Sequence, residues 1–500
     1  MPKNNKKSRS RLEIIEPPKL VFAFLMLGEL ITSVLLVVSL IKMQILPAYI
    51  IIAAGAVLLA ILAFCSYKLV FTKKSPKTIT KVLATIISIV TISLSLFAMR
   101  YSGSFNNFFS RITTKTTESK WYSVVVPVAS DIDEASELAG KSVGFLRADT
   151  RATLASEELN KTAGGIMIDY YDDTNTLLSI LDKNLSTASV MEAERFNALT
   201  EAVETTTDKY KVAFNYKITY DKEQTETTPV EVTKEPFIVY ISGSDSRIGI
   251  DDATARSDVN ILAVVNPAKG KILLATIPRD TYVQLHGTTG LKDKLTHAGL
   301  YGVNMSKATI EDFLGVKIDR TVKVSFQTVI KVVDQLDGIE IFSDTEMTLN
   351  ADKEAGINKK CYYPYGPQTV DGECALRFAR ERKKYYRGDK HRGENQQEVL
   401  SGIIKKLTGS KEYLLKLPEI LDIAADSFET SFAKDEITEF IRFQLSEGTK
   451  WQIESIGVDG EGTMLPTYTY NEFWPKLYVM IADEKSVEAT TAKINEYLEN

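Results

Sequence analysis

One stretch of the chain gathers positive charge and ends in a predicted turn. Between Arg377 and Arg392 it carries eight Lys and Arg residues against two acidic ones. Clustered guanidinium groups repel one another, and planar, bidentate Arg suits phosphate better than point-charge Lys does. A basic run is commonly a solvated face, but here Gly388-Asp389 predicts a turn, after which Arg392 and Gln396 lie one helical turn apart. The stretch is therefore a candidate anion-binding site.

Polar residues also follow or precede three apolar runs of strand length, at residues 243–247, 256–258 and 278–280. Open α/β sheets bind ligands at such strand ends. Asp245 and Asp258 can converge on one hard cation, as Mg²⁺ is bound through one or two carboxylates plus substrate phosphate oxygens. Together with the basic stretch, these residues predict a diphosphate site with a metal.

The elements that must position these residues predict an α/β sheet. Residues 237–241, 259–265 and 271–277 are rich in Val and Ile, which is typical of central strands buried on both faces. Helical and strand patterns then alternate, which favours helices on both faces of the sheet. The alternating segments are a helix at 306–314, a strand at 322–326, a helix at 328–336 and a strand at 339–342. Surface helices are predicted at residues 398–407 and 411–443.

The length and charge of the chain limit the number of its domains and the kinds of ligand that it binds. Its 500 residues are too many for one core, which predicts two or three domains. The first 100 residues hold 13 Lys or Arg and three Asp or Glu, a net charge of +10 that leaves −15 on the rest. An acidic domain is a poor binder of nucleic acid, whose affinity rests on neutralising phosphates.

The chain has three histidines, His286, His297 and His391. Their spacing is not that of a zinc site, and it does not suggest a Ser-His-Asp hydrolase. We interpret His297 as structural.

Three apolar runs, at residues 20–41, 45–67 and 79–99, each reach the ~20 residues that a bilayer requires. They follow one another without a small-residue cleavage site, which argues against a cleaved signal peptide. Basic residues cluster in the tail, residues 1–19, and in the second loop. The positive-inside rule then puts the N-terminus in the cytoplasm and the chain after about residue 100 outside. For Glu29 in the first run we favour pairing within the bundle, or protonation, over a functional role.

The amino-acid composition predicts the boundaries of the remaining domains. The polar residues 101–120 predict an extracellular stalk after the three transmembrane helices of residues 20–100. Residues 121–222 alternate short strands and amphipathic helices and predict a small accessory α/β domain. A charged, Thr-rich linker at residues 223–235 precedes the main domain. This domain has a core at residues 236–410 and is completed by C-terminal helices and a strand at residues 411–500.

Two of the three cysteines follow the predicted membrane spans. Cys361 and Cys374 lie 13 positions apart, whereas Cys65 lies in an apolar run. An oxidising exterior favours a disulfide between the first two, which would steady the loop before the basic stretch.

The motifs together resemble those of the LytR-CpsA-Psr (LCP) proteins of Gram-positive cell envelopes. They occur in the family's order over residues 236–407. The matching pieces are Gly243-Ser244-Asp245-Ser246-Arg247, Arg256-Ser257-Asp258, Ile277-Pro278-Arg279-Asp280, Lys294-Leu295-Thr296-His297-Ala298, and Arg380-x-Arg382 with Gly388-Asp389, Arg392 and Gln396-Gln397. Members often have an Arg just before the Gln, where this chain has Asn395. The anchor and accessory domain are similar to those of streptococcal capsule-locus (CpsA-type) members. The resemblance implies an α-β-α sandwich with a central mixed sheet.

The resemblance also implies an enzyme, a Mg²⁺-dependent phosphoglycosyl transferase, with Mn²⁺ as an alternative metal. Such enzymes are understood to move a glycopolymer, here a capsular polysaccharide or a related polymer, from undecaprenyl diphosphate to the primary hydroxyl of N-acetylmuramic acid in peptidoglycan. Asp245 and Asp258 would hold the metal on the diphosphate and would be catalytic together with Arg279. We also assign Asp245 as the base for the acceptor hydroxyl, although tight metal binding competes with that role. The residues that would hold the substrate are Arg247, Arg256, Lys294, Arg380, Arg382, Arg392 and Gln396.

The implied partners are the lipid-linked glycopolymer, peptidoglycan, membrane lipid and, as an open alternative, capsule assembly proteins, with no nucleic acid among them. The prenyl tail would occupy an apolar tunnel between sheet and helices. The implied location is the cell membrane of a Gram-positive bacterium. Two other functions stay open: a polyprenyl-diphosphate hydrolase that uses water as the acceptor, and a non-catalytic regulator of capsule assembly and export. A transcriptional regulator is disfavoured, because the basic site faces outward and no helix-turn-helix is evident.

Overall fold

The computed structural model divides into two compact units, Met1–Asn106 and Asn107–Asn500. It describes residues 19–43, 46, 48–72, 78–113, 117–147, 149–202, 205–221, 227–244, 256–424, 428–470 and 476–499. Two predicted site residues, Asp245 and Arg247, lie outside this described part.

The first unit consists of apolar helices, as the hydropathy pattern predicts. Its elements are α1 (Lys19–Met43), α2 (Ala48–Ser66) with a π-helical turn (Tyr67–Phe71), and α3 (Thr78–Thr113). Within the described residues, three helical segments of 23 or 24 residues are long and apolar enough to cross a membrane. Glu29 is fully buried, and neither of its carboxylate oxygens has a hydrogen-bond partner among the described residues.

The segment predicted as a stalk, residues 101–120, contains the end of one helix and the start of a strand. Helix α3 continues to Thr113, and a strand already begins at Thr117. Phe105, Phe108, Phe109 and Ile112 recur at helical spacing in this polar stretch, so the sequence supports a longer helix than mean polarity suggests.

The accessory domain is a five-stranded mixed sheet in the order β3-β2-β4-β1-β5. β2 runs parallel to β3 and β4, whereas β1 is antiparallel to β4 and β5. Its strands are β1 (Thr117–Pro127), β2 (Ser142–Leu146), β3 (Met167–Tyr171), β4 (Ala188–Glu192) and β5 (Tyr210–Asp221). Its helices are α4 (Ala152–Ala163), α5 (Thr174–Asp182), α6 (Ala193–Ala202) and α7 (Thr206–Lys209), with a 3₁₀ turn at Ala135–Leu138.

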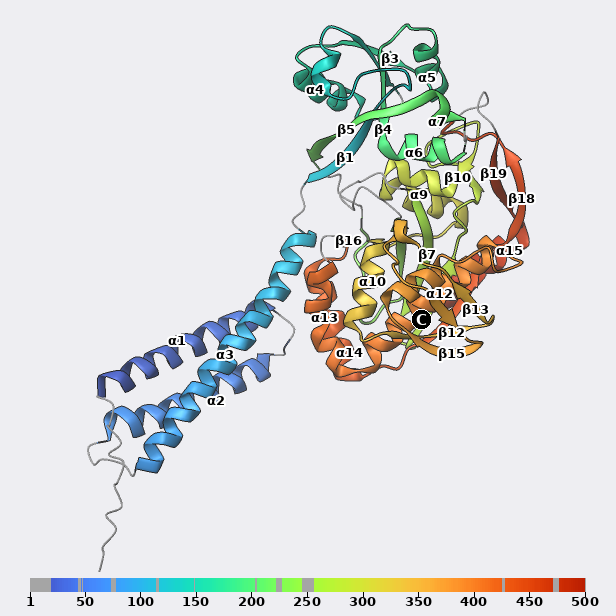
Figure 1. The fold of residues 1–500 in the computed structure, drawn as a ribbon. Coiled ribbons are helices and arrows are strands. Elements are labelled where there is room, and N and C mark those ends of the chain that lie inside the picture. The colour runs from blue at the N-terminus through green and yellow to red at the C-terminus, as the bar shows by residue number, and fades with distance from the viewer. Residues whose placement is uncertain are drawn as a thin grey trace, which may run out of the picture. The chain divides into compact units, whose positions relative to one another are not determined.

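The central sheet of the main domain has the order β16-β11-β6-β7-β8-β17. Figure 1 labels β7 and β16 of this sheet. β6, β7 and β8 are antiparallel neighbours, while β11 and β17 add parallel strands on either side, so the sheet is mixed. The strands are β6 (Phe237–Ser244), β7 (Ser257–Asn266), β8 (Lys271–Thr276), β11 (Arg320–Ser325), β16 (Phe428–Thr430) and β17 (Gln452–Gly457).

Helices cover both faces of this sheet, because its strands are apolar on both sides. Ile238 and Tyr240 of β6 pack in one cluster with residues of α9 (Val303–Leu314) and α15 (Glu484–Leu498). Phe237 and Val239 pack in another, with residues of α12 (Asp389–Gly409) and α14 (Lys434–Glu447). Successive strand residues point to opposite faces, so both alternate sets must be apolar. The α-β-α sandwich with a central mixed sheet is therefore confirmed.

A smaller lobe with its own core follows β11. It contains α10 (Phe326–Gln335), β12 (Ile339–Ser343), β13 (Met347–Leu349), a 3₁₀ turn (Lys353–Ala355), β14 (Cys361–Tyr363), β15 (Gly366–Val370) and α11 (Gly372–Ala379). Gly372 allows α11 to approach α10, because a Cβ there would lie 2.2 Å from the carbonyl oxygen of Ile330. The remaining elements are β9 (Tyr282–Val283), β10 (Asp293–Lys294), α8 (Leu295–Ala298), a 3₁₀ turn (Gly299–Tyr301), α13 (Lys411–Ala424), β18 (Gly460–Leu465) and β19 (Leu477–Ala482).

Two predicted segments differ from the structure. Residues 411–443 are not helices alone, because β16 pairs with the exposed edge of β11 between α13 and α14. The described part of the predicted linker, residues 227–235, is not a free connection. Val232 is buried against the sheet, and Arg320 donates a hydrogen bond of 2.7 Å to the carbonyl oxygen of Thr228. The valines of this segment anchor it, although its overall composition is polar.

Cys361 of β14 and Cys374 of α11 form a disulfide. We expect the Cys361→Ser/Cys374→Ser variant to lose about 3 kcal/mol of unfolding free energy, because a cross-link over roughly 15 residues restricts the unfolded chain by about that amount. Thermal unfolding of the full chain checks this. The control is the oxidised wild type after reduction, which should unfold at the same temperature as the variant. Equal unfolding temperatures for oxidised and reduced wild type would contradict the prediction.

Candidate active site

The strand order of the sheet gathers the predicted motifs at one edge. β6 ends at Ser244 opposite Ser257, where β7 begins, and Thr276 at the end of β8 is paired with Ile261 of β7. Because these strands are antiparallel, the end of one meets the start of the next. Asp258 and Arg279 are therefore neighbours although 21 residues separate them in the chain.

An ion pair between Asp258 and Arg279 forms the centre of the site. Nη1 of Arg279 donates to Oδ1 of Asp258 over 3.0 Å, and the hydroxyl of Thr296 donates to the same oxygen over 3.2 Å. Burial by itself would raise the pKa of Asp258, but Arg279, Arg256 and Arg392 outweigh it and lower this pKa to about 2. Asp258 is therefore an ionised carboxylate surrounded by three arginines.

Arg279 has a donor directed at no acceptor. Its Nε is buried and has no hydrogen-bond partner among the described residues, and the nearest carboxylate oxygen, on Asp280, is 3.9 Å away. Asp258 raises the pKa of Arg279 further above its usual range, so the guanidinium is always charged. A buried, charged donor without an acceptor fits an anionic ligand.

A second ion pair, between Lys294 and Asp280, lies next to this centre. Lys294 pairs with the buried carboxylate of Asp280. The backbone also joins the two motifs, since the N–H of Thr296 donates to the carbonyl oxygen of Arg279 over 2.9 Å. Lys294 thus contributes charge beside the Asp258–Arg279 pair.

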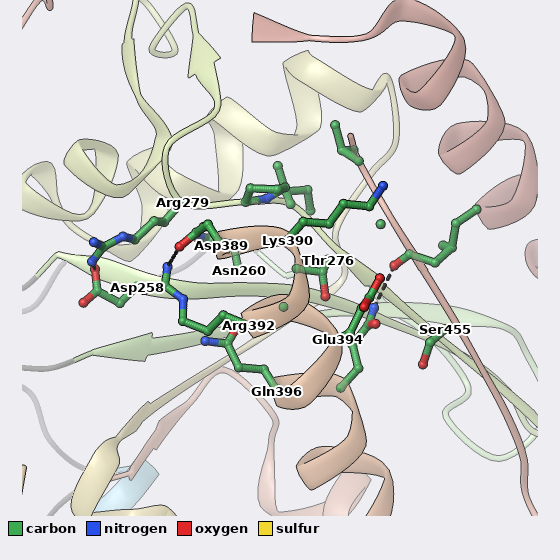
Figure 2. Close-up of a pocket in the computed structure, with 17 residues that line it drawn as sticks. Asp258, Asn260, Thr276, Arg279, Asp389, Lys390, Arg392, Glu394, Gln396 and Ser455 are labelled. Atoms are coloured by element: carbon green, nitrogen blue, oxygen red, sulfur yellow. Dashed lines mark hydrogen bonds and ion pairs between the residues drawn. The ribbon is translucent and has the colours of Figure 1, made fainter. Parts of the chain in front are cut away.

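A cavity of about 140 Å³ lies beside the pair (Figure 2). The ends of β8 and β17 and the first turns of α12 line it. Figure 2 shows Arg392 and Gln396 on the helix facing Asp258 of β7 and Arg279, which lies in the turn after β8. α12 approaches β8 closely at Gly393, where a Cβ would lie 3.0 Å from the Thr276 methyl group. The cavity is lined by Asp258, Asn260, Thr276, Ile277, Pro278, Arg279, Asp389, Lys390, Arg392, Gly393, Glu394, Gln396, Gln397, Ser455, Ile456, Gly457 and Val458.

Arg392 is held in place by its own helix. Its Nη2 lies 2.5 Å from Oδ1 of Asp389, and its side chain is about nine-tenths buried. Burial lowers the pKa of Arg392, as does Arg279, while Asp389 opposes the shift. The buried guanidinium of Arg392 and the partly exposed guanidinium of Arg279 therefore face one small cavity, an arrangement that suits a ligand with several negative charges.

A family model described as "LytR_cpsA_psr family" matches residues 201–495. The chain belongs to the LytR-CpsA-Psr family. Two similar curated proteins of Bacillus subtilis are named polyisoprenyl-teichoic acid–peptidoglycan teichoic acid transferase, TagV and TagU. TagV is 29% identical over 255 residues, 50% of this chain and 63% of TagV, and TagU is 29% identical over 283 residues, 56% of this chain and 84% of TagU. The crystal structure of B. subtilis TagV is 26% identical and covers 53% of this chain and 98% of that chain, with a TM-score of 0.44.

The LytR-CpsA-Psr domain brings together some of the predicted site residues. Asp258, Arg279, Arg392 and Gln396 line the cavity, and Lys294 is joined to it through Asp280. Arg256 contributes to the field at Asp258, and its Nε lies 4.0 Å from Glu194 of the accessory domain.

Arg380 and Arg382 are not among the residues that line this cavity, so their role in holding the substrate stays a prediction. Helix α11 ends at Ala379, and the side chain of Arg380 turns to the small lobe. There it lies 3.5 Å from Asp352 and stacks 4.8 Å from the ring centre of Phe326. Arg382 is exposed. His297 is structural, as predicted, because its buried ring is 2.6 Å from Asp293.

Sequence reasoning missed several contributors to the LytR-CpsA-Psr site. Thr296 lies inside a motif, yet nothing in the sequence predicts its contact with Asp258. Asp280 and Lys294 each belong to a matched motif, but nothing in the sequence predicts that they pair with each other. The lining residues of β17, Ser455, Ile456 and Gly457, lie within the strand and carry no signal in the sequence.

A larger, apolar cavity of about 300 Å³ lies between the same sheet and helices α12, α13 and α14. Its walls include Val265 and Ile272 of the strands and Leu407, Ile437 and Phe440 of the helices. A groove with these walls accepts an aliphatic chain and excludes charged groups.

Proposed function

We propose that this chain is a membrane-anchored transferase that moves a glycopolymer from a polyisoprenyl-diphosphate carrier to peptidoglycan. The observation that carries the proposal is the Nε of Arg279, which has no hydrogen-bond partner among the described residues and lies beside Asp258 in a cavity that Arg392 also lines. It fits a diphosphate, and the TagV and TagU relatives are named as transferases acting on a polyisoprenyl-linked polymer and peptidoglycan. The layout of the anchor and accessory domain favours a capsular polysaccharide as the polymer.

The proposed reaction needs positioning and charge neutralisation more than a protein nucleophile. The acceptor hydroxyl oxygen attacks the phosphorus nearer the polymer, the P–O–P bond breaks, and prenyl monophosphate leaves as a phosphodiester forms. Arg279 and Arg392 hold the phosphate oxygens and stabilise the charge that develops on them. Asp258 keeps Arg279 oriented through their 3.0 Å hydrogen bond. The proton of the acceptor would go to Asp245, which lies outside the described residues.

The residues present fit a divalent cation shared with substrate. No group of three or more His, Cys, Asp or Glu side chains suited to a metal occurs in the described part of the chain, so a metal bound by protein ligands alone is not supported. Asp258 is an ionised, hard oxygen donor at the cavity, and Mg²⁺ commonly binds through one or two carboxylates plus phosphate oxygens. We propose Asp258, with Asp245, as the residues that would hold Mg²⁺. Such an ion would neutralise the diphosphate.

The apolar cavity is the proposed site of the prenyl tail. We expect Ile437→Trp, which fills part of the cavity, to raise the KM for a long-chain carrier about tenfold, because each buried CH₂ contributes about 0.8 kcal/mol. The KM for a geranyl carrier should change little. Steady-state kinetics with both carriers checks this. Glu439→Trp, exposed on the same helix α14, is the matched control and should match the wild type. An equal change in KM for both carriers would contradict a role in tail binding.

We include the cellular location of the chain in the same proposal. We place the chain in the cell membrane of a Gram-positive bacterium, with the N-terminus in the cytoplasm and the catalytic domain outside. The Cys361–Cys374 disulfide supports an oxidising exterior for this domain.

The deciding experiment incubates the purified full chain with polyprenyl-diphosphate-linked polymer and peptidoglycan, with and without Mg²⁺. We expect polymer joined to peptidoglycan through a phosphodiester, formed only with the metal. Release of prenyl phosphate without such an adduct would replace the transferase with a hydrolase. Binding of the carrier without turnover, beside an active family member as positive control, would favour a regulator of capsule assembly.

A further inference from the structure

Four charged side chains are buried together in the accessory domain. Nζ of Lys120 donates to Asp149 over 3.0 Å and to Glu192 over 3.1 Å, and Nε of Arg195 donates to Glu192 over 2.6 Å. Each of the four residues is at most 7% exposed. Burial opposes the ionisation of Glu192, but Arg195 and Lys120 outweigh it and hold its pKa well below the usual range. Buried charges of this kind require fixed partners, so the network has one geometry.

Arg195 of this network also contacts residues of the LytR-CpsA-Psr domain. Its Nη1 donates to the carbonyl oxygen of Thr469 over 3.4 Å, and the hydroxyl of Tyr470 donates to the carbonyl oxygen of Arg195, also over 3.4 Å. Its guanidinium lies 5.8 Å from the ring centre of Tyr301. Tyr470 also shares an apolar cluster with Phe196 and Leu199 of α6. Arg195 is therefore bound to both domains and lies before residue 201, where the family match begins.

Thr469, which accepts a hydrogen bond from Arg195, itself donates hydrogen bonds to Asp293. The N–H of Thr469 donates to Oδ2 of Asp293 over 2.8 Å, and its hydroxyl donates to the same oxygen over 2.5 Å. The other oxygen, Oδ1, accepts from the N–H of Lys294 over 2.7 Å and lies 2.6 Å from Nδ1 of His297. Asp293 is fully buried, so all of its fixed partners belong to the protein.

The segment that Asp293 holds contributes directly to the site. Lys294 is paired with Asp280, and Thr296 donates its hydroxyl to Asp258 and its N–H to Arg279. A chain of hydrogen bonds therefore runs from Arg195 through Thr469 and Asp293 to residues 294–296 and the central ion pair.

We propose that Arg195 and Asp293 are positioning residues through which the accessory domain holds residues 294–296 in register with Asp258 and Arg279. The accessory domain then positions the transfer site and is not a separate module. We call the chain of contacts from Arg195 to residues 294–296 the brace. Misplacement of a catalytic group by 1 Å can reduce rates on the order of 100-fold, so a buried contact remote from the substrate has a kinetic effect.

The test uses the full chain and variants that keep buried charge balanced. The double variant Glu192→Gln/Arg195→Met removes one negative and one positive charge, and its folding is checked by thermal unfolding. We expect kcat per folded molecule to fall about tenfold and the KM for the carrier to rise about fivefold, since residues 294–296 position both the groups that act on the phosphate and the groups that bind it. The matched control is Arg147→Met, whose exposed arginine in the same domain pairs with Asp172. Arg195→Lys, which keeps the charge, should recover part of kcat.

Thr469→Val tests the brace from the catalytic side without leaving a buried charge unpaired. Its loss in kcat should not add to that of the double variant, because both interrupt one chain of contacts. Wild-type kcat in the folded double variant, or fully additive losses, would overturn the proposal.

This kinetic test rests on the proposed function, so a second readout is independent of it. Calorimetric binding of geranyl diphosphate should weaken about fivefold in the double variant, because Lys294 and Arg279 lose their fixed separation. If the wild type binds this diphosphate but transfers no polymer, the transferase proposal fails while the affinity difference still supports the brace. Unchanged affinity together with unchanged kcat would refute it.

Discussion

Arg279→Ala should lower kcat/KM for polymer transfer on the order of 1,000-fold, because it removes a preorganised donor to the charge that develops on the phosphate oxygens. The guanidinium is positioned by Asp258, and its Nε is the buried donor that has no hydrogen-bond partner among the described residues. The change also leaves Asp258 with one fewer counter-charge, so the cavity becomes less attractive to a diphosphate. Single-turnover kinetics with labelled carrier, combined with calorimetric binding of geranyl diphosphate, separates the loss in chemistry from the loss in affinity.

Two further variants make the Arg279 result specific. Arg279→Lys keeps the positive charge but lacks the planar fork, and it should recover less than about a tenth of the lost activity. Arg387→Ala removes an exposed arginine of the basic stretch that is paired with Glu394 over 2.7 Å and is not among the cavity-lining residues, and it should retain wild-type activity. If Arg279→Ala kept even a tenth of the wild-type rate, the proposed role of Arg279 would be wrong.

The fold of the main domain could be predicted because its strands are apolar on both faces. Ile238 and Val239 are adjacent in the sequence and pack in different clusters on opposite sides of the sheet. Such a run is stable only between two layers of helices, so local composition specifies the three-layer arrangement. The membrane helices were predictable for a similar reason, because length and hydropathy alone decide whether a segment can span a bilayer.

Segments that depend on distant partners were predicted less well. β16 has three residues and exists because the edge of β11 is available to pair with it. The described residues before β6 were interpreted as a linker from their charge, but burial of one side chain, Val232, attaches them to the sheet. Mean composition cannot show such an anchor, since one buried residue contributes little to an average.

In the site, too, some residues could be predicted from local sequence and others depend on distant contacts. Asp258 and Arg279 were predicted because strand ends carry ligands in open sheets, and Arg392 and Gln396 because a turn precedes them at helical spacing. Arg380 was assigned to the same cluster from its place in the basic stretch. The end of α11 instead directs it to Asp352 and Phe326. Proximity along a chain of Arg residues does not establish that their side chains share one ligand.

Asp258→Asn should separate diphosphate binding from transfer. The asparagine has nearly the same shape but no charge, so Arg279, Arg256 and Arg392 lose the carboxylate that they share. Without Mg²⁺, the variant should bind geranyl diphosphate at least as tightly as the wild type, because a negative charge that repels the ligand is gone. Transfer should nevertheless fall about 100-fold or more, and the response to Mg²⁺ should be lost, because the hard oxygen donor is absent.

The two opposite effects of Asp258→Asn distinguish a metal-binding carboxylate from a purely structural one. A carboxylate that only oriented Arg279 would, when neutralised, weaken diphosphate binding and transfer together and leave the Mg²⁺ dependence of the residual rate unchanged. Asp312→Asn is the matched control, since Asp312 is exposed and paired with His286 outside the cavity lining, and its transfer rate should equal that of the wild type. Mg²⁺ titrations of the transfer rate and calorimetry without metal measure the two effects on the same preparations. If the residual activity of Asp258→Asn still rose with Mg²⁺ at wild-type affinity, the ion would have to be held by other groups, and Asp258 would be left as the residue that orients Arg279.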